Sequence, residues 1–510
     1  MTTRFLRHLL AAFVVGVLLT SAAQAAVYPL EILAPRAGQT TANRYYKAYP
    51  GLIYDVNVAV VGGKFPYTYS LTASPSGMAI DASTGRITWP NPVAQSATYP
   101  VSVTVRDAAG NTVSVNWTIL VTTSGFKFID AVNGRTRAQG GDGSFANPWR
   151  TIPDWFVDKY NSANRDQFLY WRGGTYRTAE APIEDGVRLA NSNVKPVVWL
   201  AYPGETPVID TTGSYILLSG AMNNAYFDGL TVQNFTKNFG ILISSSSNNV
   251  QFRRNTFRNM PSNVGGTGSN ASAIMIANEA VKGSNWAFLD NTFTGVYTVG
   301  YGILGYSTDR VLVERNRFTD FTVNDSKAIG PKTNNSMWFI RDNRINMERG
   351  QGIWVDTYAT TRDIEISYNL VQMGSGQALW VGQEAVTYGT VTSLRNTYIG
   401  GSVQVDNLVG SSGPVSFDRD VIVNSAGTSN KITGNSSSGL SSILSTDLLV
   451  GASTSGIVDS AGNLTGSYAQ FVGTRGYQRT GVTEATPPSA AANNPAPEKA
   501  PNPPSPVAVR

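Results

Sequence analysis

The chain has 510 residues, more than one compact hydrophobic core usually holds, so we expect either several domains or an elongated repeat. Its net charge of +5 is too small to indicate nucleic-acid binding. It has no cysteine, and its one histidine, His8, lies in a leader predicted to be removed, which excludes His- or Cys-based nucleophile pairs and metal sites. Proton transfer must then use Asp, Glu, Lys, Arg or Tyr. No cofactor is required, and any bound cation would be a hard one held by oxygens, calcium first.

The N-terminus has the features of a secretory signal peptide. Arg4 and Arg7 are followed by the apolar run Leu9–Leu19 and by Ala-Gln-Ala ending at Ala25. This run of eleven residues is too short to span a membrane, and no later stretch approaches the ~20 apolar residues required. The sequence therefore predicts a cleaved leader over residues 1–25 and an exported chain, periplasmic or extracellular, that does not cross a membrane.

Residues 26–123 show short alternating runs such as YTYSLTA, YPVSVTV and TVSVNWTILV, separated by the turn sequences VGGKFP, DASTG and DAAGN. This spacing is typical of a small β-sandwich. The stretch PYTYSLTASPSGMAIDASTGRITWPNP, followed by YPVSVTVRDAAGNTVSV, resembles the immunoglobulin-like and cadherin-like modules of bacterial surface proteins. The resemblance implies an Ig-like sandwich acting as a spacer or adhesion unit.

Residues 124–483 are predicted to form a solenoid, because one asparagine recurs through six similar hexapeptides. It stands at Asn255, Asn291, Asn316, Asn343, Asn369 and Asn396, at intervals of 36, 25, 27, 26 and 27 residues. A polar residue repeated at this period is typical of stacked coils. We expect the asparagines to form an internal ladder at a turn, capping backbone groups with their amides, and we assign them no chemistry.

Each repeat carries a second strand, for example GILIS, GILGY, GIWVD and ALWVG. Its second and fourth residues are mostly Ile, Val or Leu and must point inward, so the third and fifth point outward. Because coils stack about 4.8 Å apart, each outward position becomes a ladder along the solenoid. After this region, residues 484–510 hold eight prolines and no apolar periodicity, which predicts a disordered Pro-rich tail.

Function is expected where a coil departs from this repeat. One departure is a loop of about ten extra residues, Pro261–Asn270, which either bends over a ligand or is a harmless insertion. Another is Gly330, which leaves a notch where neighbouring coils carry Leu304 and Trp354, beside a proline that removes a ladder hydrogen bond. A notch next to Lys332 predicts a sugar subsite.

Two outward ladders meet at this notch. The fifth-position ladder brings together Tyr306, Lys332 and Asp356, and the third-position ladder places Trp354 beside Trp380. Indoles with ionisable groups along a groove suit a polysaccharide, whose sugar rings have apolar faces edged with hydroxyls. The alternatives are a plain ion pair between Lys332 and Asp356, and tryptophans covered by a loop. Further polar residues lie close to these two ladders in the sequence: Asp325, Lys327, Glu348, Arg349, Tyr358 and Glu384.

The segment FIDAVNGRTRAQGGDGSFANPWRTI with FLYWRGGTYR resembles the entry segment of secreted right-handed parallel β-helix proteins. Residues 125 to about 425 resemble the pectate-lyase-like superfamily, whose members are mainly lyases, hydrolases and epimerases of acidic polysaccharides. The fold class implied is all-β, a right-handed parallel β-helix preceded by a small Ig-like β-sandwich. The histidine-containing motif of polygalacturonases is not met.

The stretch AIGPKTNNSMWFIRDN resembles the segment of chondroitinase B and alginate lyases in which a strand ends in a catalytic lysine. The resemblance implies that Lys332 is the base that removes the proton α to a uronate carboxyl. Those families place an arginine one coil later, where this chain has Asp356, and acidic calcium ligands shortly before the lysine, where it has Asp325 and Lys327.

Three functions follow from these residues. A lyase would use Lys332 or Tyr306, Arg349 and Tyr358 as base, charge-offsetting group and proton donor, and it is the first choice. A glycoside hydrolase would pair Asp356 with Asp325 or with Glu384. A non-catalytic exopolysaccharide-binding or adhesion protein would hold the same acidic polymer without cleaving it.

Overall fold

The computed structural model describes most of the chain up to residue 477. The described residues are 28–36, 43–155, 168–181, 186–190, 196–220, 222–260, 270–277, 280–297, 300–356, 361–382, 390–406, 415–424, 430–432, 448–450, 456–460, 463–471 and 475–477. All of them belong to one compact unit. The predicted leader, the Pro-rich tail, loop residues 261–269, Tyr358 and Glu384 lie outside the described residues.

The N-terminal module consists of short, mostly antiparallel strands, as predicted. One sheet has the order β2 (Lys47–Ala48), β9 (Thr112–Val121), β8 (Tyr99–Asp107) and β5 (Tyr67–Ala73). The others are β3 (Tyr54–Asn57), β7 (Arg86–Trp89) and β6 (Ala79–Ile80), and the pair β1 (Glu31–Ala34) and β4 (Ala59–Val61). Alternation in β8 buries Val101, Val103 and Val105, which gives the module its own apolar face.

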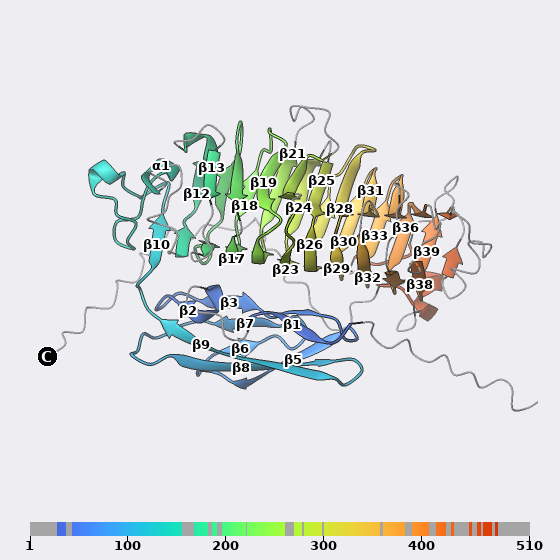
Figure 1. Ribbon diagram of the computed structural model, residues 1–510, viewed down its shortest axis with the longest axis horizontal. Coiled ribbons are helices and arrows are strands. Elements are labelled where there is room, and N and C mark those ends of the chain that lie inside the picture. Colours follow the sequence, from blue (N-terminus) through green and yellow to red (C-terminus); the bar gives the residue numbers. More distant parts are fainter. Residues whose placement is uncertain are drawn as a thin grey trace, which may run out of the picture. The chain divides into compact units, whose positions relative to one another are not determined.

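Three sheets of parallel strands form the solenoid, and Figure 1 shows their stacked coils. Sheet 1 contains β10 (Phe126–Ile129), β11 (Phe168–Trp171), β14 (Val197–Ala201), β17 (Asn223–Asp228), β20 (Asn248–Arg253), β23 (Gly283–Leu289), β26 (Thr308–Glu314), β29 (Ser336–Arg341), β32 (Arg362–Ser367), β35 (Val391–Leu394) and β38 (Val415–Asp418). Sheet 2 contains β12 (Gly174–Arg177), β15 (Pro207–Asp210), β18 (Thr231–Gln233), β21 (Thr256–Met260), β24 (Thr292–Tyr297), β27 (Arg317–Thr319), β30 (Arg344–Met347), β33 (Leu370–Met373), β36 (Thr397–Gly400), β39 (Val421–Asn424) and β41 (Leu448–Val450). Sheet 3 contains β13 (Gly186–Ala190), β16 (Tyr215–Ser219), β19 (Phe239–Ser244), β22 (Ser272–Ala277), β25 (Gly300–Tyr306), β28 (Ser326–Thr333), β31 (Gln351–Val355), β34 (Gln377–Val381), β37 (Ser402–Val405) and β40 (Lys431–Ile432). The predicted parallel solenoid is therefore confirmed.

Helical segments are short. They are α1 (Ile152–Trp155) and the 3-10 turns η1 (Arg44–Tyr46), η2 (Arg137–Gln139), η4 (Thr178–Glu180) and η5 (Gly466–Phe471). Helix α1 places Trp155 against Trp171 and Trp199, with ring centroids 5.9 and 5.5 Å away. Within the described residues, we find no helix with the length and apolar character of a membrane span.

The recurring asparagines form the predicted internal ladder at the corner between sheets 1 and 2. The Asn291 backbone N–H and side-chain amide both donate to Asn316 Oδ1 at 2.9 Å, and Asn316 donates in the same way to Asn343. The residue before each of these asparagines has a left-handed backbone, for example Arg315 with φ 56°. The left-handed residue lets the chain turn sharply at each corner. The side-chain oxygen of the asparagine then accepts a hydrogen bond from a backbone N–H of the neighbouring coil.

The interior of the solenoid is filled by residues that stack from coil to coil. Phe227, Phe252 and Phe288 lie parallel on successive sheet 1 strands, with centroids 4.7 and 5.5 Å apart. Such stacked pairs add about 0.5–1.5 kcal/mol each beyond the burial of apolar area. The continuous core explains how a chain without disulfides forms a long solenoid.

The outer face of sheet 1 packs against the N-terminal module. One hydrophobic cluster contains Tyr45 and Val60 of the module together with Tyr226, Leu312 and Phe339 of the solenoid. This face of the solenoid is therefore an internal interface, and its apolar residues contribute to holding the module in place.

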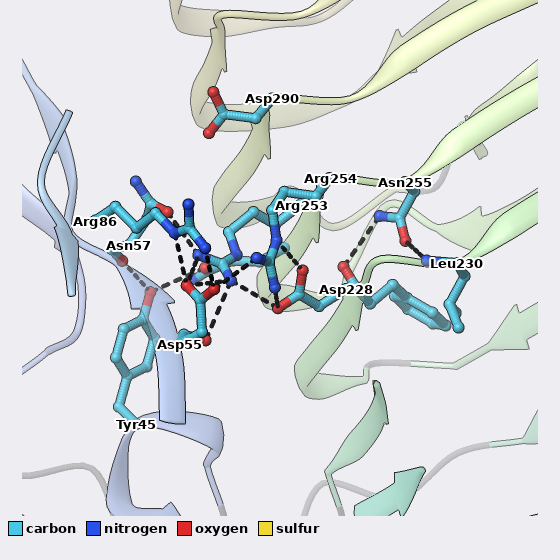
Figure 2. A network of polar contacts seen from close by, with 12 residues as sticks. Tyr45, Asp55, Asn57, Arg86, Asp228, Leu230, Arg253, Arg254, Asn255 and Asp290 are labelled. Atoms are coloured by element: carbon cyan, nitrogen blue, oxygen red, sulfur yellow. Dashed lines mark hydrogen bonds and ion pairs between the residues drawn. The ribbon is translucent and has the colours of Figure 1, made fainter. Parts of the chain in front are cut away.

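Buried charges in the same interface are paired across it, as Figure 2 shows. The Arg253 guanidinium is 0% exposed, and its Nη2 lies 2.7 Å from Asp55 Oδ1 of the module and 2.8 Å from Asp228 Oδ2. Arg86 and Arg254 also pair with Asp55. Burial alone would raise the pKa of Asp55, but the positive charges of Arg253 and Arg254 outweigh it and hold that pKa well below its usual range.

Candidate functional site

The outer face of sheet 3 carries several of the residues that the sequence singled out, among them Tyr306, Lys332 and Trp354. Four aligned residues point into the core and are 0% exposed: Ile303, Ile329, Ile353 and Leu379. On the outer side, Leu304 aligns with Gly330 and Trp354 aligns with Trp380. The predicted alternation of inward and outward positions is therefore confirmed.

Six side chains gather on this face and are called here the lysine–aromatic cluster: Tyr301, Tyr306, Lys327, Lys332, Trp354 and Trp380. The Trp354 ring lies 5.9 Å from Tyr301 at 19° and 5.7 Å from Trp380 at 31°. Trp354 is only 5% exposed, so the prediction that its ring forms part of an open aromatic strip is wrong. Trp380 is half-buried, and its Nε1 donates to Asp406 Oδ2 at 2.6 Å.

Gly330 does not leave the expected open notch. A Cβ atom at this position would lie 2.4 Å from Cε1 of Tyr301, so the tyrosine ring fills the space that the missing side chain leaves. Tyr301 itself is 0% exposed. The glycine is required because an aromatic ring approaches the backbone of β28, and the prediction of a sugar subsite in the notch is corrected accordingly.

The two lysines lie close to the same indole ring. Lys327 Nζ is 5.1 Å from the Trp354 ring centroid, and Lys332 Nζ is 5.6 Å from it. Both distances fall within the range of cation–π attraction. Lys327 is buried and also pairs with the Asp325 carboxylate, whereas Lys332 is half-buried and donates to Asn270 Oδ1 at 3.2 Å.

Burial lowers the pKa of Lys327, and the positive charge of Lys332 acts in the same direction. The carboxylates of Asp325 and Asp356 act in the opposite direction and favour the ammonium form. The positive charges of Lys327 and Lys332 therefore lie in one partly buried site. Such arrangements are common where proteins bind or convert charged ligands.

Tyr306 and Asp356 complete the cluster from neighbouring strands. Burial, with a smaller contribution from the Asp356 carboxylate, raises the pKa of Tyr306 to about 12, so the phenol is protonated at neutral pH. Asp356 is 1% exposed, and its N–H donates to Pro331 O at 3.1 Å, which aligns it with Lys332 as expected. Tyr306, however, aligns with Thr333, because the register shifts after Gly305.

Two predicted site residues lie at the edge of this face. Asp325 precedes β28, and its side chain is 59% exposed while it pairs with Lys327. The Arg349 side chain is 53% exposed and pairs with Glu348 at 3.6 Å. Among the described residues, Arg349 forms no hydrogen bond and no ring contact with the six side chains of the cluster.

Sequence reasoning missed Tyr301 and a row of glutamines on the same face. Gln351 Nε2 donates to Gln377 Oε1 at 3.1 Å, Gln377 Nε2 donates to Gln404 Oε1 at 3.3 Å, and Gln404 Nε2 donates to Asp406 Oδ2 at 2.8 Å. Tyr301 aligns with Lys327, and Lys327 with Gln351. Aligning the residues just before each apolar alternation would have placed Gln351 beside Gln377, whereas Gln404 aligns with Trp380 and could not have been found in this way.

No group of three or more carboxylates that could hold a metal ion occurs among the residues described. The oxygen groups around the cluster are the carboxylates of Asp325 and Asp356 and the side-chain amide of Asn270. Calcium binding therefore stays a prediction from the sequence.

Comparisons with known proteins agree with this architecture. Residues 33–122 match the family model described as "Putative Ig domain", and residues 239–436 match the one described as "Right handed beta helix region". A solved structure, a family 28 exopolygalacturonase from Yersinia enterocolitica, is 11% identical with a TM-score of 0.36, covering 83% of this chain and 98% of that chain. A similarity of this size does not transfer the activity of that enzyme. No curated protein matches the chain. The described fold and the two family models together identify an N-terminal Ig-like domain followed by a right-handed parallel β-helix.

Proposed function

We propose that the protein is exported and cleaves an acidic polysaccharide by β-elimination at the lysine–aromatic cluster. The observation that carries the proposal is the pair of ammonium groups beside one buried indole, those of Lys327 and Lys332. Bringing two cations together in a partly buried site costs free energy, and a bound uronate carboxylate would offset that cost.

The three steps of an elimination have candidate groups in the cluster. Lys332 is the more accessible lysine. After its ammonium group has released a proton to solvent, the uncharged amine would take the proton α to the uronate carboxyl. Lys327 would offset the charge of that carboxylate. Tyr306, a protonated phenol, would give its proton to the leaving oxygen as the β carbon–oxygen bond breaks and a carbon–carbon double bond forms. Arg349 and Tyr358 are the sequence-based alternatives for the second and third roles.

A glycoside hydrolase is the second candidate, because two carboxylates flank the cluster. The charges of Asp325 and Asp356 both act on Lys327 and on Tyr301. Hydrolysis needs two carboxyl groups about 5–5.5 Å apart for retention or about 6.5–9.5 Å apart for inversion. Asp356 with Glu384 is the other sequence-based pair, and a non-catalytic exopolysaccharide-binding or adhesion protein is the third candidate.

The test follows the ultraviolet absorbance of unsaturated uronates while the protein without residues 1–25 is incubated with polygalacturonate, alginate and hyaluronan. Lys332→Ala is the decisive variant. Lys282→Ala is its matched control, because Lys282 directly precedes β23 of sheet 1 and donates to Ser336 Oγ, at the start of β29 in the same sheet, at 3.2 Å.

A rise in absorbance that disappears only in Lys332→Ala would support elimination. New reducing ends without a rise would support hydrolysis by the carboxylates. Binding with neither signal would overturn cleavage in favour of the adhesion function.

A further inference from the structure

A row of hydrogen bonds on the outer face of sheet 3 ends at the indole of Trp380. Gln351 Nε2 donates to Gln377 Oε1, Gln377 Nε2 donates to Gln404 Oε1, and Gln404 Nε2 donates to Asp406 Oδ2. The Trp380 Nε1 group donates to the same carboxylate oxygen at 2.6 Å. The four residues Gln351, Gln377, Gln404 and Asp406 are called here the glutamine–aspartate row.

The carboxylate fixes the direction of the whole row. A carboxylate accepts hydrogen bonds and donates none, so Gln404 turns its Nε2 group toward Asp406 and its Oε1 atom toward Gln377. Gln377 and Gln351 then take the same orientation in turn. The glutamines therefore hold Asp406, and Asp406 holds the Trp380 indole.

The local backbone brings Asp406 to this position. Asp406 directly follows β37, and its N–H donates at 2.8 Å to the carbonyl oxygen of Val381, the last residue of the neighbouring strand β34. Gly382 follows that strand with φ 119°, and a Cβ atom there would lie 2.9 Å from Asp406 Cβ. The glycine therefore leaves the room that the aspartate needs beside Trp380.

Trp380 differs from the tryptophan that is aligned with it. Trp354 is 5% exposed and packs against the rings of Tyr301 and Trp380, with centroids 5.9 and 5.7 Å away. Its Nε1 is buried without a hydrogen-bond partner among the described residues, so packing alone holds this ring. Trp380 is half-buried, and its ring is fixed by the hydrogen bond to Asp406 as well. The row therefore orients the more exposed tryptophan of the pair.

The oriented indole lies near a group that would bind a carboxylate. The Trp354 ring is 5.7 Å from the Trp380 ring, and Lys332 Nζ is 5.6 Å from the Trp354 ring. Trp354 is thus the neighbour of both the ammonium group and the Trp380 indole. A sugar ring has apolar faces edged with hydroxyls, and an indole offers a matching apolar surface. A chain of linked sugars can therefore contact the lysines with one ring and Trp380 with the next.

We infer that the glutamine–aspartate row holds the Trp380 indole as the binding surface for the sugar next to the one whose carboxylate binds the lysines. Asp406 acts through Trp380 and is a positioning residue. Because the indole is already oriented in the free protein, binding costs less conformational entropy. The inference rests on the proposed binding of an acidic polysaccharide at the lysine–aromatic cluster, and it adds a second sugar contact to that site.

The test is affinity electrophoresis of the chain without residues 1–25, in gels that contain polygalacturonate, alginate or hyaluronan. Trp380→Ala should lose roughly tenfold or more in affinity for the polymer that retards the wild type. Asp406→Leu should lose roughly three- to tenfold, because it removes the hydrogen bond to the indole. Asp406→Asn keeps an acceptor oxygen and should lose little.

A double-mutant cycle separates positioning from a general structural role. Trp380→Phe keeps a ring but lacks the indole N–H, so in this background Asp406→Leu should have almost no further effect on affinity. Asp309→Leu is the matched control for the lost negative charge. Asp309 is also half-buried, but it lies on β26 of sheet 1 and accepts from Ser336 Oγ at 2.8 Å. This control should keep the affinity of the wild type, and thermal unfolding of each variant separates lost binding from lost folding.

Several results would overturn the inference. They are no retardation by any of the three polymers, wild-type affinity in Trp380→Ala, an equal loss in Asp309→Leu, or the same loss from Asp406→Leu in both backgrounds. The free uronic acid of the retarding polymer should compete much less than its short oligosaccharides, and equal competition would also contradict a second sugar contact.

The outcomes distinguish this inference from the proposed elimination. Retardation that depends on Trp380 without any ultraviolet signal would overturn the elimination and leave the positioning role of Asp406 standing. Elimination that proceeds unchanged in Trp380→Ala would overturn the role of the indole and leave the proposed function standing.

Discussion

The aromatic ring of Tyr301 occupies the space over Gly330, where a Cβ atom would lie 2.4 Å from Tyr301 Cε1. The two residues lie on neighbouring strands of sheet 3, in β25 and β28. Tyr301 in turn stacks on Trp354 with an interplanar angle of 19°. The close contact between the Tyr301 ring and the Gly330 backbone therefore holds Tyr301 in position, and Tyr301 in turn supports the Trp354 ring of the lysine–aromatic cluster.

Gly330→Ala should destabilise the protein, because the new methyl group forces the Tyr301 ring to move within a buried cluster. We expect a loss of about 1–3 kcal/mol in the free energy of unfolding, typical of overpacking. Urea unfolding measures this loss. In a Tyr301→Ala background the same substitution should cost less, and a coupling energy near zero between the two positions would contradict the contact.

Asp55→Asn should weaken the packing of the N-terminal module against the solenoid. The substitution leaves Arg253, which is 0% exposed, without its full counter-charge. Breaking a buried ion pair typically costs about 3–5 kcal/mol. Glu180→Gln is the control, since the Arg177–Glu180 pair is exposed and spans 3.8 Å, and it should change stability by about 0.5 kcal/mol or less.

The same carboxylate should make stability depend on pH. In the folded chain the pKa of Asp55 lies below its unfolded value of about 3.9. At a pH just below about 3.9 the carboxyl group is therefore still ionised in the folded chain, whereas it binds a proton in the unfolded chain. The stabilisation is present above about pH 4 and is lost as the pH falls further. Melting temperatures of the wild type should therefore fall more steeply below pH 4 than those of Asp55→Asn, and parallel curves would refute this assignment.

Asn316→Ala should test the internal ladder in the middle of the solenoid. It removes the oxygen that accepts the Asn291 backbone N–H and side-chain amide, both at 2.9 Å. Each buried donor left without a partner costs about 1–3 kcal/mol. Asn346→Ala, one coil later but exposed on sheet 2, should have little effect on chemical unfolding. Similar losses in both variants would show that the ladder is not a special source of stability.

The parts of the fold that repeat were predictable from the sequence, because periodicity reveals them directly. The asparagine spacing predicted the ladder, and the apolar alternation predicted which residues of sheet 3 point inward. The register shift after Gly305 was not predictable, because a single displaced residue leaves no mark on the apolar pattern. It aligned Tyr306 with Thr333 instead of with Lys332.

Contacts between distant parts of the chain were also beyond the sequence. Arg253 and Asp55 are separated by 198 positions, and nothing in either segment indicates the other. The prediction of an open notch at Gly330 was wrong because a side chain from the preceding coil fills it. That side chain is Tyr301, which stands just before the apolar alternation of its coil, so the pattern did not indicate where its ring points. Residue type indicated where the cluster lies, but side-chain packing decided which of its groups are buried.

Tyr306→Phe should reveal whether the phenol of the cluster supplies a proton. Because burial raises the pKa of Tyr306 to about 12, the group stays protonated throughout the neutral range, and its role as an acid should be lost only as the pH approaches that value. If it protonates the leaving oxygen, removing the hydroxyl should lower kcat by about 10²–10⁴-fold while KM changes much less. Full activity in Tyr306→Phe would instead make the phenol a packing group, and an ultraviolet difference titration of the two proteins should show that the missing tyrosine ionises only near pH 12.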